Sequence, residues 1–177
     1  TFANGFEYSA FDMATRNGRP IMGLIYELHY LSGLSNNSFY YISTALALLF
    51  LAVSIWLYQK ILAKHELNEN TRILVSFASI ANIFIIEYFM FIEKCGFMLA
   101  VLLNIVAVYF IENFFEKKNP KYIVATLITM TLAIFTYQGT IALFVILSIP
   151  FAFKYAKGFR DYVVNIVYIG FSYAFPV

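Results

Sequence analysis

Four long stretches of this 177-residue sequence contain no Asp, Glu, Lys, Arg or His. They are 16 to 32 residues long and cover Tyr30–Gln59, Cys95–Ile111, Tyr122–Phe153 and Tyr162–Val177. A helix needs about 20 apolar residues to span the hydrocarbon core of a bilayer. Charged residues make up 12% of the chain, against roughly 25% in soluble domains. The sequence therefore predicts an all-α, polytopic transmembrane helical bundle.

The remaining composition excludes several classes of protein. Twelve Lys and Arg against ten Asp and Glu give a formal charge of +2, with no basic excess to attract nucleic acid. Cys95 is the only cysteine, which excludes an internal disulfide and a cysteine-based zinc site. We expect no nucleic-acid partner, no metal site and no cofactor.

The two ends of the sequence suggest a piece of a longer protein. The chain begins with Thr1 rather than Met and stops at Val177, in an apolar stretch. No basic segment followed by an apolar one opens it, so we see no signal peptide. We expect at least one further helix upstream.

Nine of the twelve basic residues form three short clusters. The clusters are Lys60, Lys64 and Arg72; Lys117, Lys118 and Lys121; and Lys154, Lys157 and Arg160. Short loops rich in Lys and Arg stay on the cytoplasmic side of a membrane. We therefore expect all three clusters on the inner side, with an even number of crossings between consecutive clusters.

About six crossings satisfy this arrangement. Four of them are expected at Ser38–Tyr58, Ile73–Ile92, Phe97–Phe115 and Tyr162–Val177. The uncharged stretch Tyr122–Phe153 would be about 48 Å long as one helix, against a core of about 30 Å. Because basic residues flank it at both ends, we expect a hairpin that turns at Tyr137-Gln138-Gly139 and supplies the other two.

Residues 1–37 are expected on the outer side, as a loop that contains an interfacial helix. Pro20 can open a helix, and Ile21–Leu34 has apolar residues along one face. Its 14 residues would extend about 21 Å, too short to span the bilayer. Glu27 and His29 also interrupt it, which favours an interfacial or shallow re-entrant position. Residues 38–177 then form a single membrane domain.

Candidate functional residues lie on the predicted outer side. Asp12, Arg16 and Arg19 combine a carboxylate, which can act as a general base, with guanidinium groups that can bind a phosphate. Such a set suits a phosphate-bearing lipid substrate. It also fits an ordinary surface ion pair, which contributes about 0–1 kcal/mol.

Each of the other candidate residues on the predicted outer side has a functional and a structural interpretation. Glu87 in an apolar helix could be functional, or could pair with Lys94. Glu93 and Lys94 could contact a substrate or could be a polar cap on a tight turn. Tyr137 and Gln138 could bind a sugar, or could anchor the turn at the membrane interface.

Three of these segments resemble a known family. An outer Asp followed by Asn17-Gly18-Arg19-Pro20 resembles the first outer loop of the bacterial type II O-antigen glucosyltransferases. Ala81–Tyr88 followed by Phe91-Ile92-Glu93 is similar to that family's next outer-facing helix end. Phe135–Gly139 is similar to its Tyr-Gln hairpin. Together these segments cover most of the chain, which would be the N-terminal part of such an enzyme.

The resemblance implies a membrane glycosyltransferase of the all-helical GT-C type, here in part. Such enzymes pass a sugar, glucose in this family, from a polyprenyl-phosphate carrier to a lipid-linked or surface glycan such as O-antigen or lipopolysaccharide. They act at the outer face of the bacterial cytoplasmic membrane. Asp12 would then be the catalytic base.

The remaining site residues follow from the same resemblance. Glu7 is the next candidate for the base and a substrate-binding residue, and Arg16 and Arg19 would hold the phosphate. The other substrate-binding candidates are Glu87, Glu93, Lys94, Tyr137 and Gln138. The family's acidic pair lies further before its Gly-Arg than Asp12 does, so the base could also lie upstream of Thr1.

A transporter or lipid-carrier flippase is the alternative function. It would need ionisable residues near the middle of the bilayer and helices broken there. Apart from Glu87 and Pro150, the predicted crossings lack such features. The sequence therefore favours the enzyme.

Overall fold

The computed structural model describes residues 10–81 and 83–175. Within these ranges the regular structure is helical and contains no strand, as the sequence predicts. The helices are α1 (Ala10–Arg16), α2 (Pro20–Ser32), α3 (Asn36–Leu62), α4 (Glu69–Ile80), α5 (Ile83–Tyr88), α6 (Lys94–Lys117), α7 (Pro120–Thr136), the 3₁₀ turn η1 (Gln138–Thr140), α8 (Ile141–Lys154) and α9 (Phe159–Ala174).

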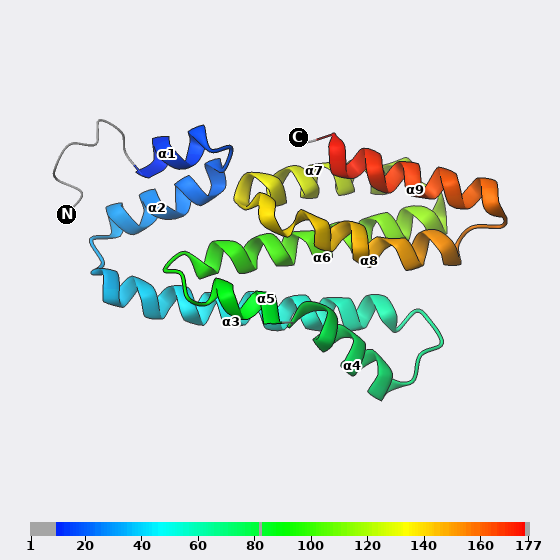
Figure 1. The fold of residues 1–177 in the computed structure, drawn as a ribbon, viewed down its shortest axis with the longest axis horizontal. Helices are drawn as coiled ribbons and strands as arrows, with labels where there is room; N and C mark the ends of the chain where they lie inside the picture. The colour runs from blue at the N-terminus through cyan, green and yellow to red at the C-terminus, as the bar shows by residue number, and fades with distance from the viewer. Residues whose placement is uncertain (1–9, 82, 176–177) are drawn as a thin grey trace.

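Helix α6 is the centre of the bundle (Figure 1). It packs against α3, α7 and α8, while α9 packs on α8 and α4 on α3. Helices α1 and α2 form a pair, and α2 also packs against α7. Met98, Val101, Ile105 and Val108 of α6 have no exposed surface. The apolar core therefore follows α6 along its length.

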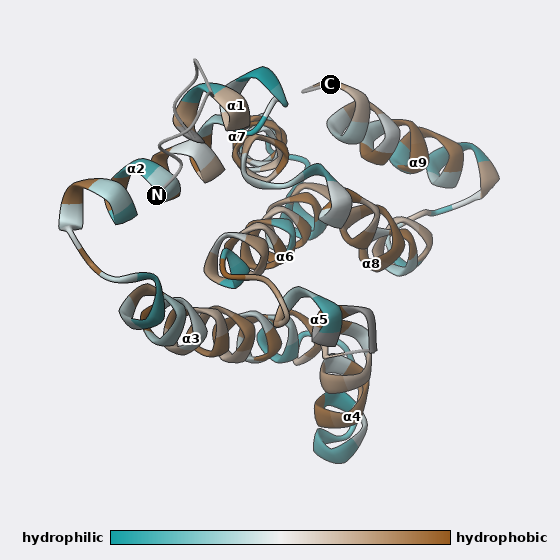
Figure 2. Ribbon diagram, turned by 60° about the vertical axis from the view of Figure 1, so that its left-hand side comes forward, coloured by the Kyte–Doolittle hydropathy of each residue, from teal (hydrophilic) through white to brown (hydrophobic). Residues whose placement is uncertain are grey.

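Two helices are long and apolar enough to cross a membrane, α3 and α6. Figure 2 shows that apolar residues dominate the ribbons of both. Their surroundings differ, because 67% of the most apolar part of α6 is buried inside the protein, against 17% for α3. Helix α3 therefore presents most of its apolar side chains outward.

The bundle has two ends, and each end gathers different segments of the chain (Figure 1). One end, which we call the Tyr137 end, holds α1, α2, the start of α6 and the turn between α7 and α8. The opposite end, the Glu112 end, holds the last turns of α3, α6 and α8. The three basic clusters lie at the Glu112 end. The predicted turn at Tyr137-Gln138-Gly139 is present: Tyr137 is extended at φ −161° and ψ 114° between α7 and η1, and α7 and α8 run in opposite directions (Figure 1).

Local signals explain how the first helices begin and end. Pro20 occupies the first turn of α2, as predicted, and Gly33 ends that helix in the left-handed conformation at φ 65°, which glycine adopts without steric cost. Ser35 then caps α3, where its side chain accepts a hydrogen bond from the Ser38 N–H. Helix α3 therefore begins at Asn36, two residues before the predicted start of this crossing at Ser38.

The predicted outward crossing Ile73–Ile92 is not one continuous helix. It is divided into α4 and the six-residue α5, and Ala81 leaves the helical conformation at φ −91° and ψ 53°. The Ala81 N–H still donates to the Phe77 carbonyl at 2.7 Å, so α4 ends with this bond. In Figure 1, α4 runs obliquely away from α3.

Cys95 is a buried residue at the start of α6. Helix α6 begins at Lys94, so Cys95 lies in its first turn, with 5% of its surface exposed. Its backbone N–H donates to Ser43 Oγ of α3 at 3.1 Å. The thiol is therefore a buried contact between α6 and its neighbours.

Candidate functional site

A cluster of polar and aromatic side chains at the Tyr137 end centres on Arg19. Its Nε atom donates a hydrogen bond of 2.9 Å to Oε1 of Gln138, 119 positions later in the chain. The guanidinium carbon lies 4.8 Å from the centre of the Tyr137 ring. A guanidinium has five N–H donors, so these contacts orient the group and leave it further donors for a ligand.

Gly18 allows the loop before α2 to approach Gln138 closely. Its φ of +72° lies in the left-handed region, and Nε2 of Gln138 donates to its carbonyl at 2.9 Å. A Cβ atom at Gly18 would lie 3.0 Å from that same nitrogen. Any side chain here would strain the backbone and crowd the amide that holds Arg19. The Asn17–Pro20 segment is thus shaped to present the guanidinium.

Three helices begin around this cluster. Arg19 is the N-cap of α2, and α8 begins at Ile141, directly after the turn that contains Gln138. Helix α6 also begins here, and its Phe97 ring lies 4.6 Å from the ring of Tyr137. A helix N-terminus carries roughly half a positive charge and a helix C-terminus roughly half a negative one. Helix α7 ends at Thr136, directly before Tyr137, and α1 ends at Arg16, so helix ends of both signs meet here. The positive charge of the cluster is therefore that of the Arg19 guanidinium, which suits a phosphate.

Aromatic rings form one wall of the cluster. Tyr137 lies edge-on to Tyr88 at 5.7 Å, and Phe97 contacts Tyr88 at 5.2 Å and Phe91 at 5.6 Å between ring centres. The Tyr137 ring also fills the space over Gly139, where a Cβ would lie 2.5 Å from a ring carbon. Gly139 therefore lets the ring turn back toward Phe97.

Glu93 is held at the same end by Tyr26 of α2. The Tyr26 hydroxyl donates a hydrogen bond of 2.9 Å to Oε1 of Glu93. Burial, and next the nearby Glu93 carboxylate, raise the pKa of Tyr26 above its ordinary range, so the phenol stays a hydrogen-bond donor. Glu93 occupies the N-cap position of α6, but its side chain accepts no hydrogen bond from the N–H groups of the first turn.

Lys94 and Glu87 do not join this cluster. Lys94 is fully buried; its Nζ donates to Thr44 Oγ1 at 3.0 Å and lies 3.1 Å from the Tyr40 ring centre. It therefore ties α6 to α3. Glu87 is exposed on α5.

The acidic and basic residues before Arg19 lie on α1 or earlier. Asp12 and Arg16 occupy exposed positions of α1, and both take part in interactions with other groups. Helix α1 packs against α2, which brings it to the same end as Arg19. Glu7 lies outside the described residues.

A second polar cluster lies at the Glu112 end, among residues for which the sequence predicted no site. Glu112 is fully buried in α6; its Oε2 lies 2.6 Å from Lys64 Nζ, and its Oε1 accepts a 2.9 Å hydrogen bond from the Tyr155 hydroxyl. Burial, and next the bond to Glu112, raise the pKa of Tyr155. One signal was available: Glu112 lies eight residues after the buried Asn104, on the buried face of α6.

His65 extends this cluster toward α8. Its Nδ1 contacts Lys154 Nζ, and its Nε2 lies 3.7 Å from Glu112 Oε1 with no hydrogen-bond partner in the described part of the chain. Burial, and next Lys154, lower the pKa of His65. A lysine ammonium can only donate, so Nδ1 accepts and Nε2 carries the proton.

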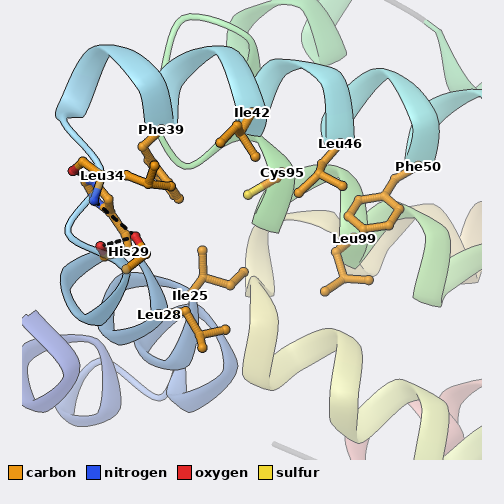
Figure 3. A pocket seen from close by; sticks show the side chains of 11 residues that line it. Ile25, Leu28, His29, Leu34, Phe39, Ile42, Leu46, Phe50, Cys95 and Leu99 are labelled. Atoms are coloured by element: carbon orange, nitrogen blue, oxygen red, sulfur yellow. Dashed lines mark hydrogen bonds between the residues drawn. The ribbon is translucent and has the colours of Figure 1, made fainter.

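An apolar groove of about 290 Å³ lies between α2, α3 and the start of α6, and Figure 3 shows the side chains that line it. Leu28, Leu46 and Cys95 are among them. His29 stacks on Phe39 at 3.9 Å between ring centres, and its Nε2 lies 3.2 Å from the Leu34 carbonyl. His29 therefore helps to close the link between α2 and α3.

Metal-binding side chains do not gather in the part of the chain that the structure describes. No three His, Cys, Asp or Glu residues lie there in an arrangement that could hold a metal ion.

No protein-family model, curated protein or solved structure matches this chain. The resemblance to the type II O-antigen glucosyltransferases therefore stays a prediction.

Proposed function

We propose that the chain belongs to a multi-pass membrane glycosyltransferase of the GT-C type. It would transfer a sugar from a polyprenyl-phosphate carrier to a surface glycan such as O-antigen. The apolar exterior of α3 supports placement in a membrane, since Tyr41, Leu49 and Trp56 expose more than half of their surface. Lipid tails would cover such side chains.

The two ends of the bundle support an inner and an outer side. All three basic clusters lie at the Glu112 end, which the positive-inside rule assigns to the cytoplasm. The Tyr137 end then faces outward in the bacterial cytoplasmic membrane. With the hairpin of α7 and α8, and with α4 and α5 together forming one outward passage, the chain would make about six crossings.

The observation that carries the proposal is the setting of Arg19. Its guanidinium is fixed by Gln138 and Tyr137 at the turn between α7 and α8, and its remaining N–H donors favour a negative charge beside it. A lipid-linked sugar phosphate would bring that charge, and Tyr137 and Glu93 lie beside it to contact the sugar.

The reaction follows from these groups. The Asp12 carboxylate would take the proton of the acceptor hydroxyl as the hydroxyl oxygen attacks the anomeric carbon of the donor sugar. The bond from that carbon to the lipid phosphate breaks, and the phosphate leaves with the bonding electron pair. Arg19, with Arg16, would stabilise the charge on the departing phosphate. Attack opposite the leaving group inverts the anomeric centre.

One observation favours the alternative of a transporter or lipid-carrier flippase. Glu112 is a fully buried carboxylate in α6, a helix that could cross the membrane, and ionisable residues in such helices often mark transport pathways. Lys64 and Tyr155 already bind both of its oxygens. Glu112 is thereby satisfied as a structural anchor, so we prefer the enzyme.

Mass spectrometry of the surface glycan tests the proposal. Cells that make the protein should show a gain of one hexose mass, and Arg19→Ala should reduce the rate of transfer about 100-fold, the effect of losing one preorganised donor. Arg160→Ala, at an exposed position at the Glu112 end, is the matched control and should transfer at the parent rate. Absence of a gain in every host glycan, with a rise in lipid-carrier flipping, would favour the transporter.

A further inference from the structure

A groove of about 410 Å³ opens at the Glu112 end, between the last turn of α3, the following loop, α4 and the end of α8. Its walls are mostly apolar and include Tyr58, Leu62, Val75 and Phe151. Tyr58, Leu62 and Phe151 are buried at 4%, 7% and 3% exposure. The groove therefore has a packed apolar floor at the end of a helix suited to cross the membrane.

Two opposite charges line the groove, Lys154 and Glu66. Both residues are exposed, and the structure forms no ion pair between these two described residues. His65 Nδ1 contacts Lys154 Nζ. An ammonium has three donors, so two of them remain for a ligand. His65 is thus a positioning residue for the lysine.

The two charged residues of the groove lining, Lys154 and Glu66, have opposite signs, which disfavours a purely anionic ligand. Lys64, next to His65 in the sequence, is already paired with Glu112 at 2.6 Å and lies 3.7 Å from Glu116. Glu66 would face any anion bound to Lys154. A ligand that carries both a phosphate and an ammonium would instead satisfy Lys154 and Glu66 together.

We propose that this groove binds a phospholipid with a phosphoethanolamine headgroup. Lys154 binds the phosphate, Glu66 accepts hydrogen bonds from the primary ammonium, and the Tyr58, Leu62 and Phe151 wall contacts an acyl chain. Basic pockets between membrane helices on the cytoplasmic side are recognised lipid-headgroup sites. The inference rests on the membrane placement proposed above and does not depend on sugar transfer.

Native mass spectrometry of the full chain in detergent tests this with three lipids of identical acyl chains. The headgroups are phosphoethanolamine, phosphocholine, whose quaternary ammonium cannot donate a hydrogen bond, and phosphoglycerol, which is anionic. We expect the first to bind about fivefold more tightly than the other two, the gain from one partly exposed charge pair.

Substitutions test which residues bind the lipid headgroup. Glu66→Gln should remove the preference for phosphoethanolamine over phosphocholine, and Lys154→Gln should weaken all three lipids. Glu69→Gln and Lys157→Gln are matched controls at exposed positions outside the groove and should bind as the parent does. Tighter binding of phosphoglycerol, a preference that survives Glu66→Gln, or no lipid bound would each overturn the proposal. The assay involves no sugar, so its failure is separate from failure of the glycan experiment.

Discussion

Replacing Asp12 with Asn should reduce the rate of sugar transfer about 1,000-fold, since positioned general acids and bases contribute 10²–10⁴-fold. The substitution keeps the size of the side chain and removes its ability to accept a proton from the acceptor hydroxyl. Asp12 occupies an exposed position of α1, so its loss should leave the protein folded and equally abundant. The measurement is the initial rate of transfer of radiolabelled glucose from polyprenyl-phosphate glucose in permeabilised membranes.

A matched control shows whether loss of any exposed carboxylate lowers the transfer rate. Asp161→Asn removes an exposed carboxylate at the Glu112 end, and it should leave the rate unchanged. If Asp12→Asn transfers at the parent rate, Asp12 is not the base. Glu7→Gln would then be the next variant to assay, and its activity would show whether the base lies further upstream.

Replacing Lys64 with Met should lower the free energy of unfolding by about 3 kcal/mol, because it leaves the Glu112 carboxylate buried without a cation. The value is at the low end of the range for buried pairs, since 32% of the Lys64 side chain is exposed while Glu112 is fully covered. Asn113, which also accepts a hydrogen bond from Lys64, would lose this donor as well. Denaturant titration in detergent micelles, followed by circular dichroism, measures the change.

Two further variants show whether the effect comes from the buried charge. Lys60→Met removes an exposed lysine one turn earlier on α3 and should change stability by less than about 0.5 kcal/mol. Lys64→Met combined with Glu112→Met should recover most of the loss, because both charges are then gone. A single Lys64→Met variant as stable as the parent would contradict the assigned role of the pair.

The sequence predicted those parts of the fold that depend on long-range composition and on strong local signals. The uncharged stretches indicated helices, the basic residues at both ends of Tyr122–Phe153 indicated a hairpin, and Pro20 marked the start of α2. Pro20 acts on the residues next to it, and the uncharged stretches and basic clusters can be read from composition alone. They are therefore visible without knowledge of which helices are neighbours.

The remaining features depend on contacts between distant segments. The sequence offered Lys94 as a substrate contact and gave Glu112 no role, yet both are fully buried. Lys94 finds Thr44 and Tyr40 on α3, and Glu112 finds Lys64 on the loop after that helix. A buried charge is stable only beside a partner, and no local pattern reveals a partner about 50 positions away.

The candidate site also combines features that the sequence predicts with a contact that only the structure shows. The Asn17–Pro20 segment and the Tyr137–Gly139 turn were each recognisable as motifs, and the sequence assigned both to the outer side. The hydrogen bond between Arg19 and Gln138 joins them, which spacing alone could not show. It is this contact that turns two motifs into one site.

Labelling of single cysteines tests the central claim, that the Arg19 cluster faces outward from the membrane. In a Cys95→Ala background, one cysteine replaces the exposed Asn17 beside Arg19, and another replaces the exposed Lys157 at the Glu112 end. With a membrane-impermeant maleimide on intact spheroplasts, we expect Asn17→Cys to react at once and Lys157→Cys to react only after permeabilisation. The reverse pattern would place the cluster in the cytoplasm, and equal labelling of both positions in intact spheroplasts would contradict a membrane-spanning bundle.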